Sequence, residues 1–482
     1  MKTTYYRHLL AGMLLLASTA TMAQTLNSAY FTEDYKFRHD MNPAFGNEQG
    51  YVAFPVLGNL NIKMQGNIGV SDVLFKNPNY GLPGEKKTVT FLHPSISYDE
   101  AMKGFSDKGL KAIFNFNTTI LSVGFKGFGG YNTIELNLKA MAGLSVPKSL
   151  VEFAKLAHND DYSFDELAVR GISYSELAFG HSRDIDEQWR VGAKIKALFG
   201  AARADLDMEG MHAQLVGDTW YLEGKAKGEI NMKGASFKTK EEEYKSRYTT
   251  DAMGNKVPQK YQRVDGVDVD GAGLGGFGLA VDLGGVYKIN DDFTVSAALT
   301  DLGFINWNNS IVAETPGGQF RFDGFHDMAI RDAYAGDGQT FGDKGDDYQD
   351  QLADFLNLED QGSKGSSTSM LAATFNAGVE YTLPVYRKIT FGFLGQHHFN
   401  GSNFSWTEGR LSANWTPLKW LDGGINLGIN SFSTSMGWIL NIHPKGYNFF
   451  IGMDHLMGKH NKDFIPVNDA NYNVAFGMSI AW

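Results

Sequence analysis

Two pairs of adjacent residues in the sequence resemble fragments of catalytic or metal sites. His397 is followed by His398, and His181 is followed by Ser182. Both pairs lie in stretches where apolar and polar residues alternate, which predicts β-strands, and neighbouring side chains of a strand point to opposite faces. Neither pair can therefore share a metal ion or act as a nucleophile with its base. The sequence also lacks the H-E-x-x-H and G-x-S-x-G patterns, so we expect no catalytic residue and no enzyme activity.

Glycine and aspartate motifs near residue 270 do not predict a cofactor site. Residues 271–276, GAGLGG, match the G-x-G-x-x-G pattern of dinucleotide-binding proteins. That site needs a helix after the glycines, whereas the alternation of residues 277–287 predicts a strand. Asp265, Asp268 and Asp270 lack the spacing and the distal Glu of a calcium loop. We therefore expect no cofactor and no metal site. The acidic run 323–361 is typical of a solvated surface loop, with binding of divalent cations as the alternative.

Charged residues interrupt several of the alternating segments. Glu135, Lys139, Arg190, Lys194 and Glu380 each lie between apolar neighbours. Alternating segments of about ten residues are typical of transmembrane β-barrels, and a charge facing lipid at mid-depth costs roughly 2–4 kcal/mol. We therefore expect these five side chains to line a polar lumen.

The C-terminal segment carries the clearest alternation. Bulky apolar residues at every second position, from Tyr472 through Phe476 and Ile480 to Trp482, enclose small or polar ones. The segment has the ~9–11 residues of a membrane-spanning strand. It resembles the last strand of outer-membrane barrels, in which a terminal aromatic residue forms part of the assembly signal. Trp307, Trp406, Trp415, Trp420 and Trp438 fall near the ends of predicted strands, where an aromatic girdle would lie.

These patterns predict an all-β fold, a transmembrane antiparallel β-barrel of about fourteen strands, with twelve to sixteen as the range. We place the strands near 51–70, 110–126, 131–143, 168–183, 189–208, 276–288, 292–304, 370–382, 388–399, 405–415, 420–430, 434–442, 446–457 and 471–482. Short turns are expected on the periplasmic side, and long extracellular loops at 209–275 and 305–369. A rival threading treats 24–110 as a plug and makes 218–233 a strand. Pro147 followed by the apolar residues Leu150, Val151, Phe153, Ala154 and Leu156 predicts a short loop helix.

The N-terminus has the features of a secretory signal. Lys2 and Arg7 precede an apolar run, and residues 21–23 approximate a cleavage site, so we expect cleavage after Ala23. Residues 24–482 then form the barrel, with 24–50 as a periplasmic or plug-like segment. The net charge of −11 gives no support to nucleic-acid binding, and the absence of Cys excludes disulfides. We expect an integral protein of the cell outer membrane, whose partners are outer-membrane lipids and the barrel assembly machinery.

Two segments carry a family resemblance. Residues 39–61, HDMNPAFGNEQGYVAFPVLGNLN, and residues 277–307 resemble a family of uncharacterised outer-membrane barrels of Bacteroidetes-type bacteria, annotated only as a domain of unknown function. More distantly, the glycine-rich start of that second segment, with Asp282, Leu283 and Gly284, is similar to FadL/TodX-like hydrophobic-compound transporters and to the PorV barrels of type IX secretion.

Two functions remain open at this point. The first is a passive or gated channel for a small hydrophobic molecule, which this resemblance favours. The second is a scaffold, without transport, that docks a secretion system or a surface lipoprotein through its long loops.

Overall fold

The computed structural model describes residues 25–67, 69–155, 160–217, 219–271, 273–323, 341–455 and 471–482. The predicted cleavage site at Ala23 lies outside the described residues. Within the described part of the chain, none of the helices combines the length and the apolar character needed to cross a membrane.

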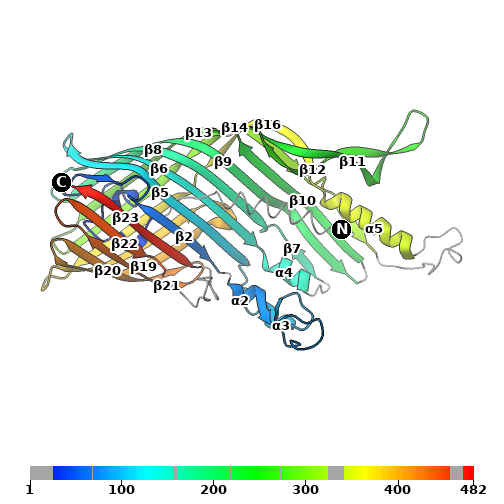
Figure 1. Ribbon diagram of the computed structural model, residues 1–482, viewed down its shortest axis with the longest axis horizontal. Helices are drawn as coiled ribbons and strands as arrows, with labels where there is room; N and C mark the ends of the chain where they lie inside the picture. Colours follow the sequence, from blue (N-terminus) through cyan, green and yellow to red (C-terminus); the bar gives the residue numbers. More distant parts are fainter. Residues whose placement is uncertain are drawn as a thin grey trace.

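Fourteen antiparallel segments close into a barrel (Figure 1). The first is formed by β1 (Tyr51–Ala53) and β2 (Leu60–Gly66), and both pair with the last strand, β23 (Tyr472–Ala481), which closes the wall. The others, in chain order, are β5 (Leu110–Gly127), β6 (Gly130–Val146), β8 (Ala168–Asp184), β9 (Trp189–Val216), β13 (Gly276–Lys288), β14 (Phe293–Glu314), β17 (Ala373–Thr382), β18 (Ile389–Phe399), β19 (Trp406–Leu418), β20 (Leu421–Asn430), β21 (Thr434–Ile442) and β22 (Tyr447–Met453). The predicted fold class and strand count are confirmed.

The rival threading is wrong because residues 51–66 belong to the wall. Its extra strand, β10 (Thr219–Met232), exists but lies beyond the end of β13. β10 pairs with β9 from Ala202 of β9 onward, whereas β13 pairs with β9 only up to Gly200 of β9.

The segments 209–275 and 305–369, expected as loops, contain mainly β-structure that lengthens one side of the barrel. They hold β10, β11 (Ala235–Thr250), β12 (Lys256–Val269), β15 (Gln319–Phe322), β16 (Glu359–Met370) and the helix α5 (Phe341–Leu356). Strands β11 and β12 form a two-stranded arm that projects from the long end of the barrel (Figure 1). Its exposed cross-strand pairs are ionic, such as Lys238 with Asp268 and Lys240 with Asp265. A charged ribbon is compatible with water, so its composition resembles that of a solvated loop. For this reason the sequence pattern did not indicate strands in these segments.

Smaller elements lie at the same end of the barrel. The predicted loop helix is confirmed as α4 (Lys148–Lys155). A small lobe between β2 and β5 contains α2 (Val70–Val73), the hairpin of β3 (Leu74–Lys76) and β4 (Thr88–Thr90), and α3 (Tyr98–Met102). The remaining elements are β7 (Asp161–Ser163) and α6 (Gly401–Phe404).

Alternation assigns the two faces of the wall. Ten large apolar side chains on the outer face are 43–62% exposed: Phe179, Ile195, Leu279, Leu283, Phe375, Val379, Phe393, Leu411, Ile425 and Leu427. Ile480 of β23 and Trp482, just after its end, are also exposed, whereas Tyr472 and Phe476 are half-buried on the same face. Because exposed apolar surface of this extent is rare on water-soluble proteins, this outer face suits lipid.

The girdle prediction holds only for part of the tryptophans. Trp415 and Trp420 are exposed near the short turns, and Trp438 lies half-buried on the outer side of β21. Trp307 and Trp406 are fully buried inside the barrel, where the Trp307 indole N–H donates to Ser369 and Trp406 stacks on His398. For these two residues the prediction was wrong, because strand-end position alone does not tell which face a residue occupies.

Candidate functional site

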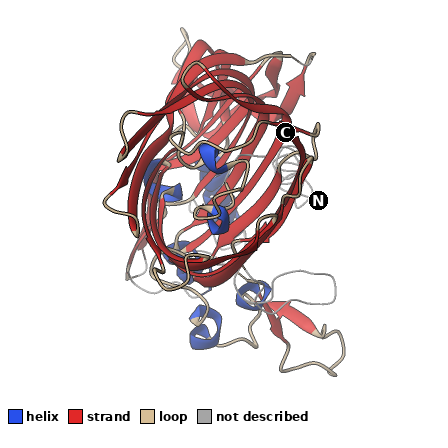
Figure 2. Cartoon of the chain, turned by 90° about the vertical axis from the view of Figure 1, so that its left-hand side faces the viewer, coloured by secondary structure: helices blue, strands red, loops and turns tan. Residues whose placement is uncertain are grey.

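Residues 25–50 lie inside the barrel at the end with the short turns (Figure 2). We call this segment the plug. It contains only two turns of 3-10 helix, η1 (Asn27–Ala29) and η2 (Arg38–Asp40). Most of its aromatic side chains, including Tyr30 and Phe37, are almost completely buried against inward residues of the wall such as Leu394 and Phe450.

Inward glycines of the wall form the seat of the plug. Gly192 of β9 and Gly284 of β13 are paired in register. A Cβ atom on Gly192 would overlap the carbonyl oxygen of Pro43, and one on Gly284 would overlap Oδ1 of Asn42. At Gly378 a Cβ would likewise meet the ring of Tyr30 at 2.6 Å. Glycine inside a strand often marks a close approach of another chain segment, and here that segment is the plug.

Asp454, just after β22, holds the start of the plug. Its carboxylate accepts hydrogen bonds from the backbone N–H groups of Asn27 and Ser28, at 3.1 and 2.7 Å. Lys63 lies 3.4 Å from the same carboxylate, and Arg410 donates to the Asp454 carbonyl at 3.1 Å. The first helical turn of the plug, whose N–H groups lack partners of their own, is thus completed by the wall.

A buried charge network joins the middle of the plug to the wall. The Lys194 ammonium donates to Glu135 at 2.6 Å, to Asp40 of the plug at 2.7 Å, and to Nδ1 of His39 at 3.2 Å. Nδ1 of His39 also lies 3.3 Å from Oδ1 of Asp40, and its Nε2 lies 2.8 Å from the Tyr51 hydroxyl.

Tyr51 extends this network into a closed ring. Its hydroxyl lies 2.7 Å from Ser122, and Ser122 donates to Glu135 at 3.3 Å, which returns the path to Lys194. We call these six residues, His39, Asp40, Tyr51, Ser122, Glu135 and Lys194, the latch network. Burial alone would raise the pKa of Asp40, but Lys194 and His39 outweigh that effect and hold the pKa well below its ordinary value. The plug carboxylate therefore stays ionised at neutral pH.

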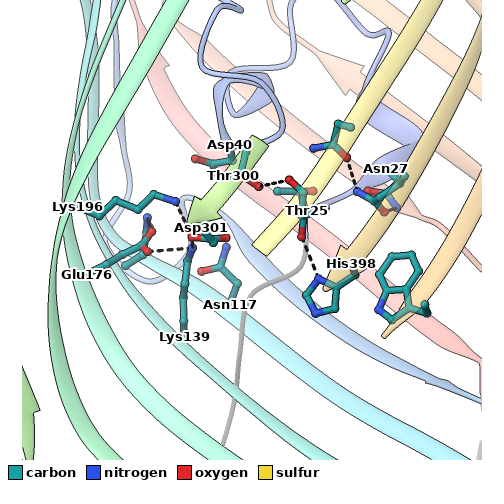
Figure 3. Close-up of a pocket in the computed structure, with 15 residues that line it drawn as sticks. Thr25, Asn27, Asp40, Asn117, Lys139, Glu176, Lys196, Thr300, Asp301 and His398 are labelled. Carbon is teal, nitrogen blue, oxygen red and sulfur yellow. Dashed lines mark hydrogen bonds and ion pairs between the residues drawn. The ribbon is translucent and has the colours of Figure 1, made fainter. Parts of the chain in front are cut away.

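A second charge cluster lies beside the plug, deeper in the barrel (Figure 3). Lys196 contacts Asp282 at 2.7 Å and Asp301 at 2.6 Å, and Lys139 contacts Glu176 at 2.9 Å and Asp301 at 3.4 Å. Lys139, Glu176, Lys196 and Asp301 border a cavity of about 40 Å³ with a mainly polar lining. That volume holds a few water molecules.

An apolar layer follows beyond this cavity, toward the long end of the barrel. It includes Ile113, Met141, Leu198, Trp307 and Phe404, all buried. Phe404 comes from α6, and its ring lies so close to Gly143 that a Cβ atom on this glycine would be only 2.6 Å from it. The lumen therefore contains three successive layers: the plug, the polar cavity and the apolar layer.

The five sequence-predicted lumen residues lie as follows. Glu135 and Lys194 belong to the latch network, and Lys139 belongs to the cluster beside the cavity. Arg190 donates to Ser182 at 3.2 Å and lies over Gly46 of the plug. Glu380 is half-buried and has Arg38 and Glu33 of the plug as electrostatic neighbours.

Sequence reasoning missed several charged residues that complete these networks. Lys196 and Glu176 follow the same alternation as Lys194 and could have been found by it. Nothing in the local pattern marks Asp40, Asp301 or Asp454, because each acts through a partner far away in the chain.

The other motifs behave as their sequence context suggested. Residues 273–275 lead into β13 and not into a helix. His398 faces the cavity, whereas His397 on the outer side bonds Thr407. Asp265 and Asp268 pair with lysines of β11. In the acidic run, residues 324–340 lie outside the described part of the chain.

Comparisons with known proteins place the chain in a family. No curated protein matches the sequence. Among solved structures, the toluene transporter TbuX of Ralstonia pickettii is 9% identical with a TM-score of 0.39, covering 96% of each chain. The toluene transporter TodX of Pseudomonas putida is 7% identical with a TM-score of 0.38, covering 96% of this chain and 95% of its own. A FadL homologue of Pseudomonas aeruginosa is 9% identical with a TM-score of 0.38, covering 96% and 99%. Residues 43–454 match the family of unknown function DUF5723, and the chain therefore belongs to that family.

Proposed function

We propose that the protein is a gated channel for small molecules in the cell outer membrane, with the plug as its gate. The observation that carries this proposal is the latch network, in which a charged segment docks on a charged wall inside a closed barrel. The chain has no Cys, so no disulfide fixes the plug. Each contact of the latch network is a hydrogen bond or ion pair that water can replace when the plug leaves. The described structure corresponds to the closed state.

The layering of the lumen supports a small hydrophobic cargo. A molecule that enters from the long end first meets the apolar layer of Trp307, Phe404 and Met141. Burial of apolar surface there is favourable at ~25 cal/mol per Å². The polar cavity beyond it stops an apolar molecule until the plug moves. The apolar outer face contacts outer-membrane lipids in this proposal, and the barrel assembly machinery inserts the protein. We propose no catalytic step.

Removal of the plug tests the gate. The mature chain and a variant without residues 25–50 are reconstituted in planar bilayers, and single-channel currents are recorded. We expect the intact chain to remain closed for most of the time and the shortened barrel to conduct steadily. Equal currents from both proteins, with both folded by circular dichroism, would contradict a gating role of the plug.

The projecting arm favours a second candidate, a scaffold that docks a secretion system or a surface lipoprotein. Strands β11 and β12 extend far beyond the wall, and an isolated two-stranded ribbon is only marginally stable in water. A partner that covers the arm would stabilise it. Deletion of residues 235–269, or of the acidic run 323–361, separates the two candidates. A channel keeps its conductance after either deletion, whereas a scaffold loses the protein that co-purifies with it.

A further inference from the structure

Three donor groups from distant parts of the chain meet near the short turns. Asp34 belongs to the plug, Asp422 lies at the start of β20, and His443 follows β21 on the neighbouring strand. Nε2 of His443 lies 3.1 Å from Oδ2 of Asp422 and 3.7 Å from Oδ2 of Asp34. All three donor atoms lie within 4.8 Å of one another. We propose that these residues form a binding site for a divalent transition-metal ion of the Zn²⁺ type.

The separations of the donor atoms fit such an ion. Zinc binds histidine nitrogen and carboxylate oxygen at ~2.0–2.2 Å, which puts two tetrahedral ligand atoms about 3.4 Å apart. The separations of 3.1 and 3.7 Å lie on either side of that value, so the ion needs only small movements of the side chains. One imidazole with two carboxylates suits zinc better than calcium or magnesium, which prefer oxygen ligands in larger number.

An unpartnered buried oxygen gives independent support to the site. Asp422 and His443 are each more than nine-tenths buried. Within the described residues, Oδ1 of Asp422 makes no hydrogen bond, and Nε2 of His443 contacts only the two carboxylates of the site. A buried polar atom without a partner is costly, and a metal ion satisfies Oδ1. Asn441 donates to Oδ2 of Asp422 at 3.1 Å and accepts from Asn448 at 2.6 Å, which is the outer support that metal ligands usually have.

Charge distinguishes this site from the other cluster of similar composition. His39, Asp40 and Glu135 also lie close together, but the Lys194 ammonium already lies between their donor atoms. Lys36 of the plug acts electrostatically on Asp34 and Asp422, but its ammonium donates to the amide oxygens of Asn47 and Gln49 at 2.7 and 3.3 Å. Among the residues that the structure describes, no lysine or arginine forms an ion pair with either carboxylate.

The location of the site suggests its role. Its ligands join the plug to two strands of the wall, and the Asp34 side chain is one-third exposed, which leaves a route for the ion from the short-turn end. If the plug is the gate proposed above, a bound ion holds it closed. Metal binding itself does not depend on that proposal.

Zinc titration of the purified barrel tests the site. The protein is treated with a chelator in detergent and titrated with Zn²⁺ in a calorimeter. We expect one ion per chain, and at least tenfold weaker binding in H443Q and in D34N. The control is E187Q, which removes an exposed carboxylate from the turn between β8 and β9 at the same end of the barrel. Absence of saturable binding by the wild-type protein, or unchanged affinity in folded H443Q and D34N, would overturn the proposal.

A current measurement separates the site from the gate. In bilayers we expect Zn²⁺ to lower the open probability of the wild-type protein and to leave D34N unaffected. Zinc that binds at these residues without a change in current refutes the pinning role and leaves the metal site established. Conversely, a plug deletion that fails to open the barrel refutes the gate, while the calorimetric result still decides the site.

Discussion

Replacement of Lys194 by Met should release the plug. Lys194 is 2% exposed, and its ammonium is the cation that lies between Glu135 and Asp40. The substitution keeps most of the side-chain volume and leaves two carboxylates buried without their cation. Removing one partner of a buried ion pair costs ~3–5 kcal/mol. Since every ~1.4 kcal/mol changes an equilibrium tenfold, the docking equilibrium should shift toward the undocked plug by a factor of at least about 100.

Single-channel recording measures this shift directly. We expect K194M to show a large rise in open probability at neutral pH, with an unchanged conductance of the open state. The triple variant K194M/E135Q/D40N removes all three charges and should recover most of the closure, because replacing a complete buried ion pair is nearly neutral.

An exposed ion pair provides the matched control. Lys126 of β5 and Glu48 of the plug also join wall to plug, at 3.2 Å, but their side chains are 61% and 87% exposed. Exposed pairs contribute little to stability, so K126M should behave like the wild-type protein. If K194M stayed as closed as K126M while remaining folded, the latch network would not hold the plug and the reasoning would fail.

Three further predictions concern acid, the glycine seat and the C-terminus. Docking lowers the pKa of Asp40. The stabilisation from its charge is therefore fully present above the ordinary pKa of about 3.9 and is lost as the pH falls through the lower docked pKa. We expect the contribution of Asp40 to closure, measured against D40N, to vanish only in strong acid. G192A should weaken docking by ~1–3 kcal/mol through overlap with Pro43, whereas G285A, whose Cβ would meet nothing closer than 3.9 Å, should not, and protease protection of the plug in folded barrels reports the difference. Deletion of Trp482 should lower the yield of membrane-inserted barrel, and W482F should restore it; equal yields from all three proteins would exclude a role of this residue in assembly.

The wall of the barrel could be predicted from sequence because its signal is local. Alternation over ten residues, as in 472–482, decides which face each side chain occupies and where the strand runs. The same reasoning failed at β11 and β12, because the charged composition of this ribbon looks like that of a loop. It also failed for Trp307 and Trp406, which share their end of the barrel with lipid-facing residues but point inward.

The contents of the lumen could not be predicted, because they depend on contacts between distant residues. Asp34 and His443 are 409 positions apart by their numbers, and Asp40 reaches Lys194 across 154 residues. Gly192, Gly284 and Gly378 are needed where the plug touches the wall, and nothing in their local sequence indicates this role. Only the closed barrel brings these residues into contact.

Inward glycines and charged side chains of the wall both contact the plug, and both bear on the proposed gate. Inward glycines at Gly192 and Gly284 are costly in a strand unless another segment covers them, so they indicate a wall shaped for the plug. Glu135 and Lys194 hold the docked plug through Asp40, and in the proposed gate water hydrates the same charges once the plug has left. Leu394 and Phe450 also contact the plug, so undocking in this proposal exposes apolar surface as well. The charged contacts are the part of the interface that can exchange the plug for water, and for this reason the K194M variant is the decisive test of the gate.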